Sequence, residues 1–219
     1  MRSQLMTVDE GSAASVSQGR TSEYMGALSL IAGAFSSGGK LLVCGNGGSA
    51  ADSSHIAGEL VKSFEGKRTL DKVAVSSLIL AGEERGKKLA GLLEAGLPAI
   101  SLAADGAVMS AISNDIGPGA IFAQQVMALG FAGDVLLCIS TSGESENVIN
   151  AAITAKAKGM AVIGLMGPDT STLSKYCDVS LLAQGRSTAQ IQSAHQVLYH
   201  DLCKDLEAWL IDGAGQRAE

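Results

Sequence analysis

The chain has 219 residues, of which 47% are hydrophobic, 17% charged and 4% aromatic, with 27 glycines and a formal net charge of −6. This composition excludes a disordered chain, supplies enough apolar residues for a buried core, and fits one domain spanning residues 1–219. Because no block of Lys and Arg stands out, we expect no nucleic acid and no anionic membrane as partner.

The elements predicted along the chain alternate between helices and short apolar strands. A helix is expected over about 22–35, a strand over 40–45 that a glycine closes, and a helix over 49–64. Further strands are predicted at 97–103, 133–140, 160–167 and 177–183, with helices near 107–112, over 146–159 and from about 188 to 210. Continuous apolar strands between helices indicate a parallel sheet with both faces covered. The expected fold is a three-layer αβα sandwich with a five-stranded parallel sheet, of the flavodoxin-like type.

Residues 66–96 interrupt this alternation. They predict one or two amphipathic helices inserted before the second strand. The expected solvated face of this helical insertion carries Glu83, Glu84, Arg85, Lys87 and Lys88.

The N-terminus and the cysteines suggest a compartment. Residues 1–20 are polar and small, lack the apolar segment of a signal peptide, and are predicted to form a flexible tail. No apolar run is long enough to span a membrane. The cysteines have neither CxxC nor zinc-finger spacing, so we expect reduced thiols in a cytoplasmic protein.

Two loops that follow predicted strands could bind an anion. Residues 45–50 (GNGGSA) are rich in glycine, which lets a ligand approach the backbone next to a helix N-terminus. A tight turn is an equally good interpretation, and the spacing fits neither a Rossmann nor a Walker motif. Residues 140–145 (STSGES) carry four hydroxyls at the start of a helix, which predicts a phosphate cup, although a serine-rich N-cap would also explain them.

Two helices carry further polar residues that suggest chemistry. His55 and Glu59 are four residues apart and share one helix face, where they could bind a metal, serve as acid and base, or form an ordinary surface pair. The last helix contributes Gln192, His195 and His200, and for His195 we favour a role without chemistry. Gln192 and His200 lie roughly 12 Å apart along a straight helix. They could therefore share a metal only if it lay between them or if another subunit supplied a ligand.

Five stretches, taken together, resemble the sugar isomerase (SIS) family, and within it the bacterial phosphoheptose isomerases. They run in family order from about residue 40 to 203: CGNGGSAADSSHIAGEL, AISNDIG, GDVLLCISTSGESENVINA, AKAKGMAVIGLMG and TAQIQSAHQVLYHDLC. Each stretch alone is weakly specific, and the combination is specific.

The resemblance implies roles by position. Ser49, Ser140, Thr141, Ser142 and Ser145 would hold the sugar phosphate, while Asn46, Gly47, Asp115 and Gln192 would contact the sugar. The positions that bind zinc in zinc-containing members are matched by His55, Glu59, Gln192 and His200, and the acid–base pair by Glu59 and His200. Members are usually homotetramers with active sites at subunit interfaces. Instead of contacting the sugar, Asn114 and Asp115 could form a simple turn that ends a helix.

The implied reaction converts sedoheptulose 7-phosphate to glycero-manno-heptose 7-phosphate through an enediol, in glycan precursor synthesis. It needs a base at carbon and an acid at oxygen, and either Glu59 or His200 could be the base. A zinc ion could polarise the carbonyl group. The alternative is a non-catalytic SIS protein, either a sugar-phosphate-binding module or a factor that associates with a replication initiator, but retention of Glu59 and His200 favours an enzyme. Glu144 departs from the Asn common in the family, so its carboxylate must point away from the phosphate or weaken binding.

Overall fold

The computed structural model describes residues 21–216, with side chains to residue 211, so the predicted tail at 1–20 lies outside the described residues. Its centre is a parallel sheet in the order β2-β1-β3-β4-β5. The strands are β1 (Leu41–Gly45), β2 (Ala99–Ser101), β3 (Val135–Ser140), β4 (Ala161–Met166) and β5 (Val179–Leu182). The five-stranded parallel sheet predicted from the sequence is confirmed.

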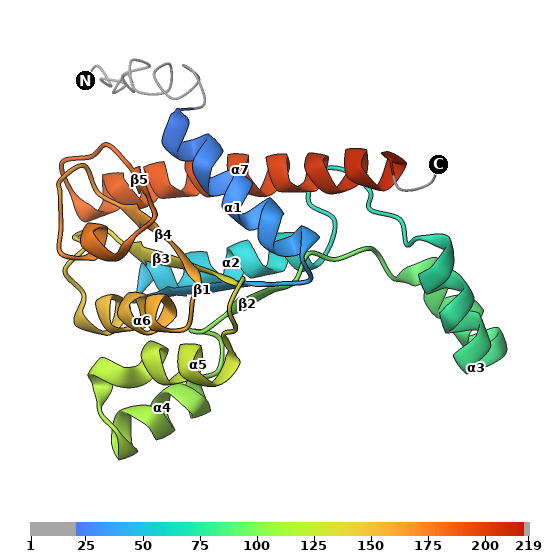
Figure 1. Cartoon of the computed structure of the whole chain (residues 1–219), viewed down its shortest axis with the longest axis horizontal. Coiled ribbons are helices and arrows are strands. Elements are labelled where there is room, and N and C mark those ends of the chain that lie inside the picture. The colour runs from blue at the N-terminus through green and yellow to red at the C-terminus, as the bar shows by residue number, and fades with distance from the viewer. Residues whose placement is uncertain (1–20, 217–219) are drawn as a thin grey trace, which may run out of the picture.

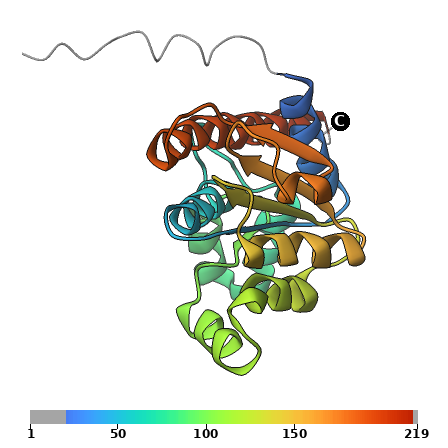
Figure 2. The ribbon, with the colours of Figure 1, turned by 90° about the vertical axis from the view of Figure 1, so that its left-hand side faces the viewer.

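Helices cover both faces of the sheet (Figures 1 and 2). One face packs against α1 (Ser22–Ser36), α2 (Gly48–Val61) and α7 (Thr188–Gln216). The other packs against α5 (Ile121–Leu129) and α6 (Glu146–Ala157), while α4 (Gly106–Asp115) lies against α5. Short 3₁₀ turns, η1 (Pro118–Ala120) and η2 (Leu173–Tyr176), complete the connections. This is the predicted three-layer sandwich.

The sequence of β3 shows why its strand is apolar throughout. Val135, Leu137 and Ile139 belong to the core shared with α1, α2 and α7, whereas Leu136 and Cys138 belong to the core beneath α5 and α6. Successive side chains of a strand point to opposite faces. A strand covered on both sides therefore buries every residue, and all of β3 is buried.

The structure departs from the prediction most clearly at two helices. The helix expected over 49–64 ends at Val61, and the chain then turns toward the insertion. Helix α5 was not predicted; it is only nine residues long and starts without a side-chain cap. In the described part of the chain, no helix is both long and apolar enough to cross a membrane. All four cysteines are free, as expected.

The insertion contains α3 (Lys72–Leu92), which projects from the body as a two-part arm at the right of Figure 1. The helix breaks at Glu83, whose backbone adopts φ 46° and ψ −120°. Within α3 only Gly86 is buried. We call residues 72–92 the arm; the predicted helices are present, but they bury no apolar face against the residues that the structure describes.

The arm is fixed to the body at a neck between residues 63 and 68 and residues 94 and 95. Arg68 is 2% exposed, donates hydrogen bonds to the carbonyl oxygens of Glu59 and Leu60, and pairs with Glu207 at 3.1 Å. Burial acts to raise the pKa of Glu207, but three backbone N–H donors at residues 64–66 and Arg68 together lower it. The N–H of Ala95 donates to the carbonyl oxygen of Arg68 at 3.1 Å, which closes the neck.

Candidate active site

Helices α2 and α7 lie side by side on one face of the sheet and run in the same direction (Figure 1). Near their starts, a β-carbon added at Gly48 would come 2.5 Å from Nε2 of Gln192. The side-chain amide of Gln192 therefore packs against the backbone of Gly48, in the glycine-rich loop at residues 45–50. About two turns further along both helices, His200 comes beside His55. The two helices therefore bring residues from distant parts of the sequence together at two levels.

Glu59, His55 and His200 form one cluster at the second level. His55 Nε2 lies 3.2 Å from Glu59 Oε1, and the rings of His55 and His200 meet edge to face with centroids 5.0 Å apart. Phe64 stacks on His200 with a centroid separation of 5.6 Å. Both members of the predicted acid–base pair therefore contact His55.

Lys62 influences the charge of Glu59. Its Nζ donates to Glu59 Oε2 at 2.8 Å, and this hydrogen bond is the largest cause of a lowered pKa for the carboxyl, against the opposing effect of burial. Glu59 is consequently ionised at neutral pH. An ionised carboxylate can accept a proton, which is what a base at carbon must do.

Tyr199 connects this cluster to the half-buried carboxylate of Asp52, and neither residue was predicted from the sequence. The Tyr199 hydroxyl donates to Asp52 Oδ1 at 3.3 Å and lies 3.2 Å from His55 Nδ1. A tyrosine hydroxyl has one proton, so with that proton on the Asp52 bond its oxygen accepts from Nδ1–H of His55. The Nε2 lone pair of His55 is then directed at Glu59, an arrangement that a proton or cation between the two groups stabilises.

The sequence held a signal for one of these two missed residues. Asp52 lies three residues before His55 and seven before Glu59, the spacing of a single helix face. Burial raises the pKa of Asp52, and its Oδ2 has no hydrogen-bond partner among the described residues. Tyr199 gave no such signal, because a buried aromatic residue at core spacing indicates packing only.

His195 is fully buried in the core and ties α7 to the end of β4. Its Nε2–H donates to the carbonyl oxygen of Met166 at 3.1 Å. Burial lowers the pKa of the ring, so the neutral form is favoured. This placement agrees with a role outside the chemistry.

The two predicted anion-binding loops lie next to each other, because β1 and β3 are neighbours and Gly45 pairs with Ile139 at their carboxyl ends. Asn46 in the first loop and Asn147 in the first turn of α6 exchange amide hydrogen bonds of 2.8 and 2.9 Å. Asn147 was not predicted. This exchange joins the N-termini of α2 and α6 into one surface.

The second loop is organised by its own hydroxyls. Ser140 Oγ accepts the N–H of Gly143 at 3.1 Å and lies 3.3 Å from Ser145 Oγ, and Ser142 Oγ accepts the N–H of Glu144 at 3.2 Å. Ser145 precedes α6 without a side-chain hydrogen bond to the helix. The uncapped N-terminus of α6 therefore opens beside a turn lined with hydroxyls, which suits an anion.

The carboxylate of Glu144 points away from this loop, which is the first of the two outcomes expected from the sequence. Its Oε1 accepts the N–H of Thr172 at 2.7 Å, and hydrogen bonding at Thr172 is the main cause of its lowered pKa. The negative charge is thus held toward η2.

The remaining residues that were predicted to contact the substrate lie on several different elements. Gly47 precedes α2 with φ 55°, Ser49 is buried in the first turn of that helix, and the carbonyl oxygen of Thr141 accepts the N–H of Gly167. Asp115 ends α4 and accepts a hydrogen bond from Asn114 at 2.8 Å. The described contacts do not join Asp115 to the cluster around His55, so its contact with sugar stays a prediction.

The four predicted zinc ligands have suitable chemistry but do not meet at one point in a single chain. Imidazole and carboxylate donors suit zinc. Within residues 21–211, no group of three or more His, Cys, Asp and Glu side chains is arranged to hold a metal ion. Gln192 lies at the level of Gly48, away from His200. Zinc therefore stays a prediction.

Comparison with known proteins defines the class to which this fold and site belong. The family model described as SIS domain matches residues 12–89 and 83–167, so the chain belongs to the SIS domain family. Within that family, it is 40% identical to the phosphoheptose isomerase of Roseiflexus sp. over 81% of this chain and 77% of the relative.

Two solved structures show the same similarity. The phosphoheptose isomerase of Neisseria gonorrhoeae matches with a TM-score of 0.69 and 34% identity, over 86% of this chain and 87% of that one. The phosphoheptose isomerase of Francisella tularensis matches with a TM-score of 0.70 and 32% identity, over 85% of both chains. The resemblance inferred from the five sequence stretches is confirmed.

Proposed function

We propose that this chain is an aldose–ketose isomerase that interconverts sedoheptulose 7-phosphate and glycero-manno-heptose 7-phosphate. The observation that carries the proposal is the meeting of Glu59 and His200 at His55, on helices α2 and α7. The loop before α2 is joined through Asn46 to Asn147, next to the hydroxyl-lined loop. The similarity to phosphoheptose isomerases supports the choice of substrate. The cluster contains an ionised carboxylate and an imidazole, which are group types suited to the two proton transfers of the reaction.

The phosphate end of the substrate would bind at the second loop. The hydroxyls of Ser140, Thr141, Ser142 and Ser145 and the N-terminal amides of α6 would supply donors without a cation. Asn46, held by Asn147, would orient the sugar chain between this loop and the cluster.

In the ketose-to-aldose direction, Glu59 would take a proton from C1, and the electron pair of that C–H bond would form the enediol. His200 would carry a proton from the C1 hydroxyl to the C2 oxygen, and the acid form of Glu59 would return a proton to C2. The result is an aldehyde at C1 and a hydroxyl at C2, with no net gain or loss of atoms. We assign the proton transfer at carbon to Glu59, because the lowered pKa of its carboxyl keeps it ionised.

The quaternary structure, the compartment and the metal belong to the same proposal. We expect a cytoplasmic homotetramer with sites at subunit interfaces, and the free cysteines agree with a reducing compartment. His55, Glu59, Gln192 and His200 would be zinc ligands if a second subunit completes the site, and bound zinc would polarise the substrate carbonyl. Elemental analysis of purified protein and of the His55→Ala variant tests the metal without reference to turnover; equal zinc in both would refute these ligands.

The decisive experiment is turnover of sedoheptulose 7-phosphate in D₂O, followed by NMR. The wild type should give the aldose with deuterium at C2, and Glu59→Gln should lose both turnover and exchange at C1, by about 10³-fold. His200→Asn should lose turnover but keep part of the exchange. Glu65→Gln, an exposed carboxylate paired with Lys204, is the control and should behave as wild type. Full activity in Glu59→Gln would sink the assignment.

A non-catalytic sugar-phosphate-binding protein is the second candidate. The hydroxyl-lined loop alone would serve such a protein. The contact of Glu59 and His200 with His55 favours the enzyme, because binding a phosphate does not require this cluster. Thermal stabilisation by sedoheptulose 7-phosphate without any turnover would support the second candidate instead.

A further inference from the structure

The ring of His200 differs from the other two histidine rings in how it is held. His55 Nδ1 lies 3.2 Å from the Tyr199 hydroxyl, and His195 Nε2 donates to the carbonyl oxygen of Met166 at 3.1 Å. Within the part of the chain that the structure describes, no hydrogen bond orients the half-buried ring of His200. The χ2 torsion of a histidine has broad energy minima. Packing must therefore set the orientation of this ring.

Three aromatic rings of the described chain surround His200, and one of them lies against its face. The rings of His55 and Tyr199 meet it edge to face, with interplanar angles of 79° and 76°. Phe64 stacks on it, with an interplanar angle of 28° and centroids 5.6 Å apart. Rotation of the imidazole about χ2 would drive its edge into the Phe64 ring, so this contact opposes the rotation.

Phe64 is itself held by the helix that carries His200. The backbone N–H groups of residues 64, 65 and 66 all donate to the carboxylate of Glu207, at 2.7, 2.8 and 2.7 Å. Glu207 is 3% exposed and pairs with Arg68 at 3.1 Å. It follows His200 by seven residues on α7, which is the spacing of one helix face. Helix α7 therefore holds both the imidazole and the backbone from which the Phe64 ring extends.

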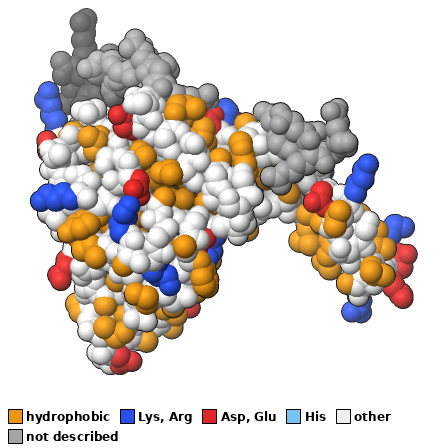
Figure 3. Space-filling view, in the orientation of Figure 1, with side chains coloured by type: hydrophobic (Ala, Val, Ile, Leu, Met, Phe, Trp, Pro, Cys, Tyr) orange, Lys and Arg blue, Asp and Glu red, His pale blue; other side chains and the backbone are white. Residues whose placement is uncertain are grey.

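The arm does not take part in holding Phe64. Its apolar side chains are exposed, with Leu80 at 88% and Val73 at 74%, and Figure 3 shows hydrophobic side chains on its surface at the right. Within α3 only Gly86 is buried. Among the described residues, the contacts that fix Phe64 are therefore those of the neck and of α7.

We propose that Phe64 is a positioning residue for His200 in the isomerase reaction, an inference that rests on the proposed function. Its ring holds the imidazole in the orientation in which it meets His55, beside Glu59. A proton transfer requires the donor and the acceptor to be within hydrogen-bond reach. A misplaced His200 would therefore slow the transfer of the proton between the two oxygens, while Glu59 would still remove the proton from C1.

Nuclear magnetic resonance of protein labelled at its histidines tests the position of the ring without substrate. In the wild type, the face of Phe64 should shift the ring protons of His200, and these protons should show a nuclear Overhauser effect to His55. Phe64→Leu keeps an apolar side chain but removes the flat face, so both signals should weaken, whereas Phe64→Tyr should keep them. Signals in Phe64→Leu equal to those of the wild type would overturn the proposal, whether or not the protein converts the sugar phosphate.

Kinetics in D₂O test the consequence for the reaction. In Phe64→Leu, kcat should fall about ten- to a hundredfold with little change in KM, because the orientation of a reacting group is lost. Deuterium exchange at C1 should fall less than turnover, and Phe64→Tyr should recover most of the loss. If Phe64 only supported the fold, exchange and turnover would fall by the same factor, and that result would overturn the proposal.

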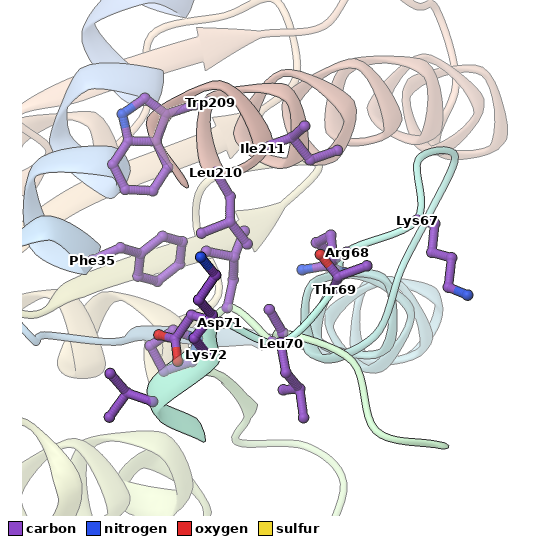
Figure 4. A pocket seen from close by; sticks show the side chains of 15 residues that line it. Phe35, Lys67, Arg68, Thr69, Leu70, Asp71, Lys72, Trp209, Leu210 and Ile211 are labelled. Carbon is purple, nitrogen blue, oxygen red and sulfur yellow. The ribbon is translucent and has the colours of Figure 1, made fainter. Parts of the chain in front are cut away.

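Phe35→Leu is the matched control. Phe35 and Phe64 are both half-buried and pack against the same core. Phe35 lines a cavity of about 650 Å³ at the foot of the arm (Figure 4), and the described contacts do not join it to His200. Both variants should lower the melting temperature, with circular dichroism to verify folding, but only Phe64→Leu should raise the ratio of exchange to turnover. The same rise in Phe35→Leu would contradict the proposal. A wild type without turnover would refute the proposed function, and the resonance comparison would still decide the position of the ring.

Discussion

Tyr199→Phe tests how the cluster around His55 is held. The change removes one hydroxyl from a side chain that is 2% exposed and leaves its size almost unchanged. The hydroxyl lies 3.3 Å from Asp52 Oδ1 and 3.2 Å from His55 Nδ1, so the half-buried Asp52 and the exposed His55 each lose a partner. Asp52 Oδ2 already has none among the described residues, and its carboxylate would then lack any donor.

The expected losses of stability and of turnover can both be worked out from these contacts. Leaving a buried polar group unpaired costs about 1–3 kcal/mol, and we take about 2 kcal/mol for this site. For a chain of this length, the melting temperature should fall by roughly 4–8 °C. Without the Tyr199 oxygen, His55 is no longer held as the Nδ1–H tautomer. Because His55 is a predicted zinc ligand, kcat should fall about tenfold, the lower end of the effect of removing a partner of a metal-binding histidine. KM should change little, because the phosphate loop does not contact Tyr199.

Tyr24→Phe is the matched control. The Tyr24 hydroxyl donates to Asp205 Oδ2 at 2.7 Å, so the same chemical change breaks a similar bond to an aspartate of α7, away from the cluster. It should lower the melting temperature and leave kcat unchanged. If Tyr199→Phe also kept wild-type kcat while losing stability, the argument that Tyr199 positions His55 would be refuted.

Three further predictions follow from other contacts. Glu207→Gln should cost about 3–5 kcal/mol in the free energy of unfolding, measured in urea, because Arg68 stays buried without its charge partner. The folded pKa of Glu207 is lowered from 4.5, so its contribution exists above that pH and is lost as the pH falls, and the variant should show a flatter acid limb. Lys62→Met should move the acid limb of the kcat/KM profile to higher pH, because the lysine lowers the pKa of the Glu59 carboxyl; an unmoved limb would argue against Glu59 as base. Ser142→Ala should raise KM several-fold at constant kcat, and an unchanged KM would speak against phosphate at this loop.

The fold could be predicted because its signals are local and repeated. The apolar run of β3 is buried on both faces, and such runs between helices indicate a covered parallel sheet. The sequence signal for helix α5 was weaker, because its nine residues follow a proline-containing turn and begin without a capping side chain. The direction in which the arm projects could not be predicted either, because amphipathic periodicity does not say what an apolar face will pack on.

The site was predictable where a single element carries the pattern. Glu59 lies four residues after His55, and helical spacing alone puts them on one face. The pairing of Asn46 with Asn147 depends instead on β1 and β3 being neighbours, and strand order is a property of the whole sheet. Tyr199 could not be predicted for the same reason, because its hydroxyl reaches His55 only when α7 lies beside α2.

The closed neck of the arm has a consequence for how this chain could vary. Ala95 bonds back to Arg68, so the polypeptide leaves the body and returns to it at one point. Arg68 is anchored there by Glu207 and by the last carbonyl groups of α2, with no contribution from residues 72–92. Residues 72–92 could therefore be lengthened, shortened or replaced, by recombination or by design, while the contacts of Arg68 that hold the neck to the body stay intact.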